Sequence, residues 1–353
     1  MAYPLKKSTK TMKQELLRVG MIGVSNFGSY RREKMRASGR FKVLAVCDRN
    51  EQALAAAARE EGAPPYRDFA EMLQHRELEA VVISTGADTH ARFAVAAMRA
   101  GLHVFVEKPL CATVAEIQEL RRVQRETKRV IGVGHNHCPS DTLLELAREF
   151  ISTGRLGTVV TYEENSSHSG GLEILPGDWR GMADRNPGGI LFHCGVHSLH
   201  ALSYLFGPIK SVQAMMRYDA NPNTQTADVA NVLLRHESGL IGTLNCYHVT
   251  AYCHELRLFG TKGNFYFDTH LRRGWFQQRK WNEAEEREPL EIPSPKPGHD
   301  HANLVSWFEA IRNGGKPHPS LEEGICALLP VFAAETADKQ HREVNVREID
   351  QEG

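Results

Sequence analysis

The sequence lacks the features that would place it in a special class of protein. Its 353 residues carry 43 Lys plus Arg and 43 Asp plus Glu, so the formal net charge is zero. Without a basic stripe or a basic amphipathic segment, the composition does not favour partners such as nucleic acid or a membrane surface. No apolar run approaches the roughly 18 residues that a membrane-spanning helix needs. We find no internal repeat and no low-complexity segment, so an ordinary globular protein is expected.

Cysteine is scattered along the chain. The seven Cys residues include no C-x-x-C pair, so we expect neither a disulfide framework nor a zinc ribbon. Such a pattern suits reduced thiols and predicts a cytoplasmic protein. Residues 1–16 lack the apolar segment and the small-residue cleavage site of a signal peptide, and we expect them to form a solvated tail.

The hydrophobic pattern divides the chain into two parts, as its length leads us to expect. Between residues 17 and 136, short apolar runs alternate with helical patterns, which predicts a doubly wound parallel (Rossmann) sheet that binds a dinucleotide. Residues 137–353 predict an α+β domain for substrate binding and oligomerisation, with a large, mostly antiparallel sheet. Its final helices could pack back on the first domain. The strands expected are 17–22, 43–47, 80–84, 104–106, 130–133, 158–165, 211–218, 227–235, 240–248, 255–259 and 264–268.

A glycine turn, Gly23-Val-Ser-Asn-Phe-Gly28, follows the first expected strand. It matches the pattern G-x-G-x-x-G with Ser25 at the second glycine. The first glycine permits a tight turn, and the helix N-terminus beyond it offers N–H groups to a pyrophosphate. A turn of this kind also occurs without a ligand. We expect Gly23, Ser25, Asn26, Phe27 and Gly28 to contact the cofactor.

Asp48 ends the second expected strand, where a carboxylate accepts hydrogen bonds from the adenosine ribose hydroxyls. It would also repel a 2′-phosphate, which favours NAD over NADP, although Arg49 could hold such a phosphate. Asp48 could also cap a helix. The predicted cofactor is NAD, with NADP possible. Thr85, His90 and Glu107 complete the expected cofactor site, although His90 could serve only as a helix cap.

Lys108 lies in the run Glu107-Lys108-Pro109, directly after the expected strand 104–106. Residues that leave the carboxyl ends of such strands face the cofactor crevice. Because the following proline stiffens the turn, Lys108 can reach a substrate hydroxyl beside a nicotinamide ring. The tripeptide alone is a weak signal that gains weight from the glycine turn and from a downstream histidine cluster.

That cluster is His193, His197 and His200. If a helix begins near Leu191, His193 and His197 lie one turn apart on one face. Two imidazoles at that spacing suit proton transfer near neutral pH. We expect His193 and His197 to be catalytic, and His200 only to fill a packing position or to cap the helix.

The same histidine spacing also occurs in helical metal sites. His135 and His137 could approach from the domain junction, but no carboxylate or cysteine clearly completes a metal shell. We therefore predict proton transfer and no metal.

Four residues are candidates for substrate contact. Asn136 and His137 follow the last Rossmann strand and should face the crevice between the domains. Trp179 could stack on a sugar ring, although it could equally pack in a core or interface. Arg180 could bind a substrate oxygen or a cofactor phosphate, although surface pairing would also explain it.

Together these motifs resemble the glucose–fructose oxidoreductase and inositol dehydrogenase family of NAD(P)-dependent enzymes. The resemblance runs from Arg18 to about Val346. Besides the glycine turn, Asp48 and His197, it includes Thr89-His90-Ala91, Ala100 to Pro109, Gly154-Arg-Leu-Gly157, Asp178-Trp179-Arg180, Gly188-Gly189 and Leu258 to Gly263.

The resemblance implies that Lys108 lies beside the nicotinamide and contacts the reacting hydroxyl, and that His197 is in the active site. Family dehydrogenases usually have an aspartate at the position of His193, and that aspartate shares proton transfer with the histidine. His193 could take over as the base, or the chemistry could differ.

The resulting prediction is an oxidoreductase that transfers a hydride between a nicotinamide cofactor and a sugar, polyol or related cyclic compound. One alternative is an NAD-dependent glycosidase or lyase that oxidises its sugar transiently, which the substitution at His193 motivates. The other is a non-enzymatic NAD-binding regulator, against which Lys108 and His197 argue. Relatives are often oligomers, and an open antiparallel sheet face is a natural contact surface, so we expect a homodimer or homotetramer.

Overall fold

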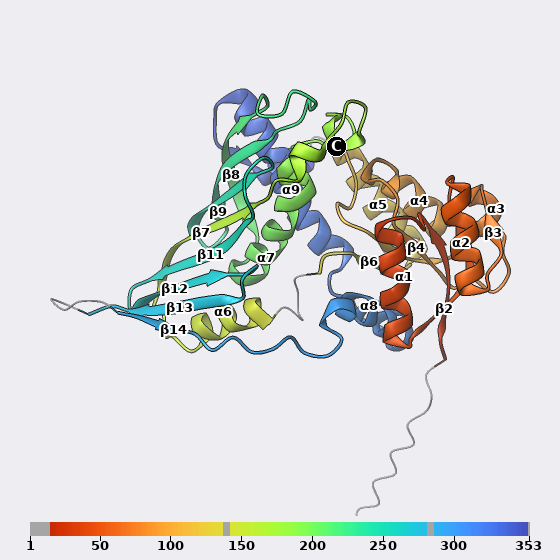
Figure 1. Ribbon diagram of the computed structural model, residues 1–353, viewed down its shortest axis with the longest axis horizontal. Coiled ribbons are helices and arrows are strands. Elements are labelled where there is room, and N and C mark those ends of the chain that lie inside the picture. Colours follow the sequence, from red (N-terminus) through yellow and green to blue (C-terminus); the bar gives the residue numbers. More distant parts are fainter. Residues whose placement is uncertain (1–14, 137–141, 281–285, 352–353) are drawn as a thin grey trace, which may run out of the picture.

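The computed structural model describes residues 15–136, 142–280 and 286–351, which build two sheets with a layer of helices between them (Figure 1). His137, expected to contact substrate, lies outside the described residues. None of the described helices is long and apolar enough to cross a membrane.

The first sheet has six parallel strands in the order β3-β2-β1-β4-β5-β6. This is the strand order of a doubly wound dinucleotide-binding sheet, in which the order reverses between β1 and β4 and opens a crevice there. The predicted Rossmann fold is confirmed. Its strands are β1 (Leu17–Ile22), β2 (Phe41–Cys47), β3 (Pro65–Tyr66), β4 (Ala80–Ile83), β5 (His103–Val106) and β6 (Ile131–Val133).

Helices cover both faces of this sheet, which is why its strands read as continuous apolar runs. All four residues of β4, for example, are buried. The helices between the strands are α1 (Phe27–Ser38), α2 (Glu51–Glu61), α3 (Phe69–Leu73), α4 (Ala87–Arg99) and α5 (Val114–Thr127).

A helix from the far end of the chain completes this core. Trp307 of α8 (Ala302–Asn313) is fully buried and stacks on Phe41, with ring centroids 5.9 Å apart. It also packs at 5.5 Å against Phe105 in β5. Burial of this aromatic group holds α8 against the Rossmann sheet.

The second sheet has nine strands in the order β14-β13-β12-β11-β7-β10-β9-β8-β15. Among the described strands of this second sheet, β7 and β10 form the one parallel pair, and the other pairs are antiparallel. The predicted mostly antiparallel sheet is confirmed. Its strands are β7 (Val159–Ser167), β8 (Ile209–Arg217), β9 (Val229–His236), β10 (Ile241–Tyr247), β11 (Cys253–Gly260), β12 (Gly263–Asp268), β13 (Arg273–Gln278), β14 (Arg287–Pro289) and β15 (Val344–Asn345).

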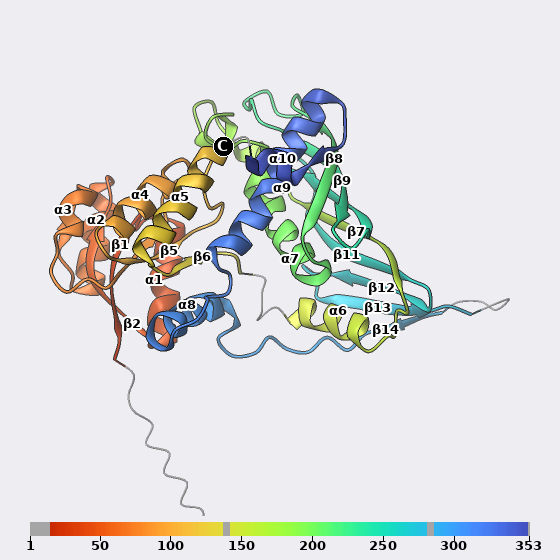
Figure 2. The same cartoon turned by 180° about the vertical axis from the view of Figure 1, so that it is seen from behind.

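One face of this sheet packs on helices, and these helices lie toward the Rossmann domain (Figure 2). They are α6 (Thr142–Ser152), α7 (Val196–Phe206) and α9 (Leu321–Gln340), and the short α10 (Val346–Gln351) follows β15. The other face carries exposed apolar side chains, including Met215 at 80% and Leu233 at 41% exposure. A π-helical turn, Leu191–Gly195, leads into α7, so the helix expected near Leu191 begins with a wider turn.

Candidate active site

The glycine turn lies at the carboxyl edge of the Rossmann sheet, next to the point where the strand order reverses. Gly23 has φ of 80°, and a Cβ atom there would lie 2.6 Å from the backbone carbonyl of Ser84. A Cβ on Gly28 would lie 2.0 Å from the carbonyl oxygen of Gly23. Both positions therefore need glycine. Asn26, the N-cap residue of α1, makes no side-chain capping bond, and the N–H groups of Gly28 and Ser29 donate to the carbonyl oxygens of Ser25, at 2.8 Å, and Asn26, at 3.0 Å.

Asp48 anchors this turn from the end of β2. Its Oδ2 accepts hydrogen bonds from the backbone N–H groups of Val24, at 2.8 Å, and Ser25, at 3.3 Å. The N-cap of α2 is Asn50, whose side chain accepts from Ala53 N–H, so the capping alternative for Asp48 is wrong. The carboxylate instead has a fixed place in the crevice.

His90 is buried and holds two loops together. Its Nδ1 lies 2.7 Å from the carbonyl oxygen of Pro109, and its Nε2 lies 2.9 Å from that of Thr85. The N-cap of α4 is Gly86, so His90 does not cap the helix either. Both ring nitrogens thus face carbonyl oxygens of the chain, and a contact between His90 and a cofactor stays a prediction. His90 positions the turn that carries Lys108.

Glu107 forms a buried ion pair with Arg31, with Arg31 Nη2 2.6 Å from Glu107 Oε1. Arg31 comes from α1 and is fully buried, and sequence reasoning did not single it out. Because both charges are buried, removing either side chain would leave the other charge buried without its partner. Glu107 therefore links α1 to the end of β5, and its contact with a cofactor stays a prediction.

Lys108 reaches across to the second domain. Its Nζ donates a hydrogen bond to the carbonyl oxygen of His193 in the π-helical turn, at 3.2 Å. Burial lowers the pKa of Lys108, since the charged form loses hydration. Asn136, nearby at the end of β6, accepts at Oδ1 from Asn303 Nδ2 at 3.1 Å. The structure thus brings Lys108 to the histidine cluster, as the sequence predicts.

The π-helical turn gives His193 and His197 different neighbours. His193 lies edge-on to Trp179 and near His248, with ring centroids 6.0 Å apart in each case. His197 instead lies 5.5 Å from His135. Regular helical spacing would place His193 and His197 on one face of the helix, and the wider turn separates them. π-Helical turns occur often at functional sites. His200 is buried and stacks on His135 at 4.5 Å, which suits the filling role expected for it.

The surroundings of His193 oppose its expected role as a base. Burial and the charge of Lys108 lower the pKa of His193 to about 3. Such a ring stays neutral near pH 7 and holds a transferred proton poorly. The pKa of the neighbouring His248 is lowered to about 4, again mainly by burial.

A hydrogen-bond chain fixes the protons around His193. Gly170 N–H donates to His168 Nδ1 at 2.9 Å, so the proton of a neutral His168 sits on Nε2 and points to Cys194 Sγ at 3.0 Å. Cys194 Sγ in turn lies 3.5 Å from His193 Nδ1. Burial raises the pKa of the Cys194 thiol. The chain therefore consists of neutral groups, with Cys194 as the donor to His193.

His168, His193 and Cys194 also have the spacing of a metal site, with ligand atoms within 4.8 Å of one another; they form one such group among the described residues. A histidine that binds metal through Nε2 normally donates its Nδ1 proton to an acceptor. Here Nδ1 of His168 faces the N–H donor of Gly170. The donor opposes metal binding at His168, and the absence of a metal stays our prediction.

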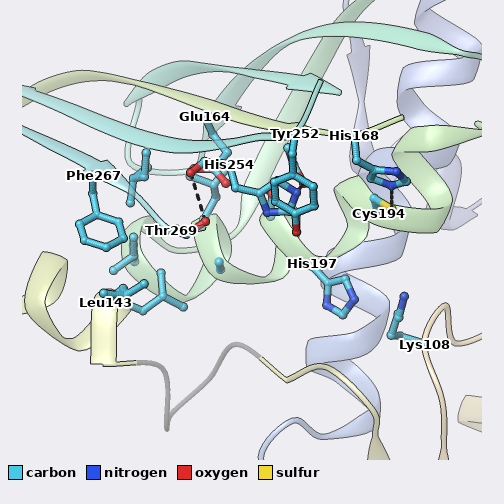
Figure 3. A pocket seen from close by; sticks show the side chains of 17 residues that line it. Lys108, Leu143, Glu164, His168, Cys194, His197, Tyr252, His254, Phe267 and Thr269 are labelled. Atoms are coloured by element: carbon cyan, nitrogen blue, oxygen red, sulfur yellow. Dashed lines mark hydrogen bonds between the residues drawn. The ribbon is translucent and has the colours of Figure 1, made fainter. Parts of the chain in front are cut away.

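The side chains converge on a cavity of about 350 Å³ between α7 and the second sheet (Figure 3). Lys108 and His197 lie at one end, whereas Leu143 and Phe267 lie at the other. His193 is not among the lining residues. The lining comprises Lys108, Leu143, Leu144, Glu164, Ser166, His168, Cys194, His197, Ser198, Ala201, Leu202, Leu205, Tyr252, His254, Leu256, Phe267 and Thr269.

Trp179 and Arg180 lie outside this lining. Trp179 packs on His193, and Arg180 Nε pairs with Asp178 at 3.1 Å from each carboxylate oxygen. These contacts agree with the packing and pairing alternatives, and the substrate contacts of Trp179 and Arg180 stay predictions.

Several polar lining residues were missed by sequence reasoning: Glu164, Ser166, His168, Tyr252 and His254. The alternation of Glu164 and Ser166 on β7, continued by His168 directly after it, was the available signal, because alternate residues of a strand face the same side.

Comparisons with known proteins agree with this geometry. Residues 17–135 match the oxidoreductase family with an NAD-binding Rossmann fold, and residues 144–266 match the GFO/IDH/MocA C-terminal domain. A myo-inositol 2-dehydrogenase from Thermotoga maritima is 22% identical over 94% of this chain and 99% of its own length. A D-apiose dehydrogenase from Paraburkholderia graminis is 24% identical over 98% of this chain and 93% of its own.

Solved structures share the fold. A structure described as an NADPH-dependent oxidoreductase from Desulfitobacterium hafniense superposes with a TM-score of 0.88 at 23% identity, covering 95% of this chain and 99% of its own. A levoglucosan dehydrogenase in complex with NADH and levoglucosan gives a TM-score of 0.82 at 20% identity, covering 94% and 100%.

Proposed function

The chain belongs to the GFO/IDH/MocA family of oxidoreductases, whose N-terminal domain binds NAD, and we propose that it is a dehydrogenase acting on a CH–OH group of a sugar, polyol or related cyclic compound. One observation carries the proposal: Lys108 and His197 line one end of a single cavity, and Lys108 comes from the carboxyl edge of the NAD-binding sheet.

The residues of the crevice fit a dinucleotide. Close backbone approach at Gly23 and Gly28, beside the N-terminus of α1, suits a pyrophosphate. Asp48 accepts from the backbone N–H groups of Val24 and Ser25 at Oδ2 and from that of Asn50 at Oδ1, at 2.9 Å, and the remaining lone pairs of the carboxylate would accept from ribose hydroxyls. Arg49 is exposed. The fixed carboxylate supports NAD over NADP.

The bound nicotinamide accepts or supplies the hydride. Lys108 orients the reacting hydroxyl with a preorganised N–H donor and stabilises negative charge that develops on its oxygen. The carbonyl of His193 holds Lys108 in place. His197, at the same end of the cavity, accepts the hydroxyl proton during oxidation and returns it during reduction.

A second candidate keeps the cofactor but changes the net reaction. The resemblance implies an aspartate at the position of His193, and the lowered pKa of this histidine makes it a weak second base. Transient oxidation followed by elimination and reduction would give an NAD-dependent glycosidase or lyase. A regulator without activity is disfavoured by the placement of Lys108 and His197.

An assay of NADH formation with a panel of polyols and sugars, including myo-inositol, D-apiose and levoglucosan, tests the main proposal. NADH should form with at least one compound. Analysis of the same mixtures for cleaved products separates the two candidates, because the second yields product without net NADH. If no compound reacts in either assay although NAD binds, the regulator is favoured.

We also propose that the open face of the second sheet forms a homodimer or homotetramer contact. Exposed Met215 and Leu233 on this face support it. Met215→Glu should lower the molecular mass measured by light scattering, whereas a monomeric wild-type protein would exclude this contact.

The free thiols among the described cysteines fit a cytoplasmic location.

A further inference from the structure

The cavity beside Lys108 changes in polarity along its length. The lining side chains of the π-helical turn and α7 read, from the N-terminal to the C-terminal end, Cys194, His197, Ser198, Ala201, Leu202 and Leu205. At a rise of 1.5 Å per residue, His197 and Leu205 are about 12 Å apart along the helix axis. A six-membered ring built from bonds of about 1.5 Å is far shorter than this. A sugar held at Lys108 therefore leaves the far end of the cavity unfilled.

The second sheet repeats the same gradient across the cavity. Along β11 the lining side chain changes from His254 to Leu256. Leu256 pairs with Glu164 on β7 and with Phe267 on β12, so an apolar pair adjoins a carboxylate. Glu164 accepts a hydrogen bond from Ser198 at 3.0 Å. This bond marks the boundary between the polar and the apolar parts.

The far end is built from apolar side chains on four elements. Leu256 and Phe267 are 6% and 3% exposed, and Leu202 is 1% exposed, so these side chains form an apolar wall that is already packed in place, whereas Leu205 is half-buried. Leu143, Leu144 and Leu205 complete it. Cavities that bind small molecules usually combine such apolar walls with a few polar groups that set orientation.

We infer that the substrate is amphipathic: a hydroxylated ring bound at Lys108 and His197 that carries an aryl or alkyl substituent seated among Leu202, Leu205, Leu256 and Phe267. This inference rests on the proposed function, because Lys108 marks the reacting end. It names the substrate class as glycosides or ethers with an apolar substituent, in preference to free sugars.

Calorimetric titration of the NAD-loaded protein with methyl and n-hexyl β-D-glucoside, galactoside and mannoside tests the inference. Each methylene that enters an apolar site raises the affinity about fourfold. We expect at least one hexyl glycoside to bind about tenfold or more tightly than its methyl counterpart. Equal affinities within every pair, or no saturable binding of any hexyl glycoside, would overturn the inference.

Variants localise the effect. Leu205→Gln should lower the affinity for the hexyl glycoside toward that for the methyl glycoside. Leu271→Gln, the same change at a side chain that is 54% exposed between β12 and β13, should leave the difference as in the wild type. If Leu205→Gln melts at a lower temperature, Leu205→Trp, which fills the cavity, provides the second variant. An unchanged preference in a folded Leu205 variant would also overturn the inference.

NADH formation in the same mixtures separates this inference from the proposed function. If hexyl glycosides bind more tightly but are neither oxidised nor cleaved, the inference of an amphipathic ligand stands and the proposed dehydrogenase activity is wrong. If substrates are oxidised with no preference for the longer substituent, the proposed activity stands and the inferred apolar subsite is wrong.

Discussion

The Nζ atom of Lys108 lies 3.2 Å from the carbonyl oxygen of His193. This hydrogen bond joins the edge of the Rossmann sheet to a π-helical turn 85 residues later in the chain. It uses the backbone of His193, so a different side chain at this position can leave the placement of Lys108 intact.

Lys108→Met should preserve the fold and the affinity for NAD but strongly reduce turnover. A preorganised donor to the reacting oxygen contributes about 2.7–4 kcal/mol to transition-state stabilisation, or roughly 10²–10³-fold in kcat. Steady-state kinetics with calorimetry for NAD measures both. Lys42→Met, at an exposed position on β2, is the matched control. Full turnover in a folded Lys108→Met variant would remove Lys108 from the mechanism.

NAD should bind more tightly than NADP, because Asp48 would face the 2′-phosphate. Asp48→Ala should narrow the preference, since it removes both the ribose acceptor and the repulsion. It also removes the anchor of the Val24 and Ser25 amides, so some loss of NAD affinity is expected. Tighter binding of NADP to the wild type would show that Arg49 dominates the site.

His197→Ala should be more damaging to turnover than any change at His193, because His197 lines the cavity and His193 does not. His193→Asp restores the residue usual in the family and should retain or increase turnover on a simple polyol. Its backbone carbonyl still holds Lys108. The kcat values of the two variants on one substrate decide the order, and a greater loss at His193 would reverse the assignment.

Activity should survive exhaustive chelation. His168 receives a hydrogen bond at Nδ1 from Gly170 N–H, which opposes ligation through Nε2. Elemental analysis of the purified protein and turnover after dialysis against a chelator provide the measurement. Loss of activity that zinc or manganese restores would make His168, His193 and Cys194 a ligand set.

Acidification should destabilise the protein in a window set partly by His193. Its pKa is lowered to about 3 in the folded protein, so the unfolded state binds more protons below the ordinary pKa of about 6.5. The contribution of neutral His193 to the free energy of unfolding is therefore fully present above about pH 6.5 and is lost as the pH falls toward 3. At pH 5 about 2 kcal/mol of it is lost.

Thermal melting of His193→Asn between pH 7 and pH 5 should show a shallower loss of stability than the wild type. Lys108, His168 and His248 face the same ring and act in the same direction on its pKa. Carboxylates such as Glu79, whose pKa is lowered to about 2, lose their contribution only at lower pH. Equal slopes for variant and wild type would contradict the buried neutral state of His193.

The sequence by itself predicts the Rossmann sheet and most of the antiparallel sheet, because both depend on local periodicity. Continuous apolar runs indicate strands buried on both faces, as β4 shows. The edge strands β13 to β15 did not follow from the pattern, since short strands at a sheet margin carry little periodic signal. Local motifs also place Lys108 and the glycine turn, because both follow directly from the strands that precede them.

Only the tertiary structure decided which side chains meet. Cys194 lies in the π-helical turn, His168 directly follows β7 and Leu256 lies on β11. The contact between His168 and Cys194 joins residues 26 apart, and the pairing of Leu256 with Glu164 joins residues 92 apart. The extra residue in the π-helical turn separates His193 from the cavity that His197 lines, which helical spacing does not predict. Burial then lowers the pKa of His193, and burial is a property of packing that no local motif contains.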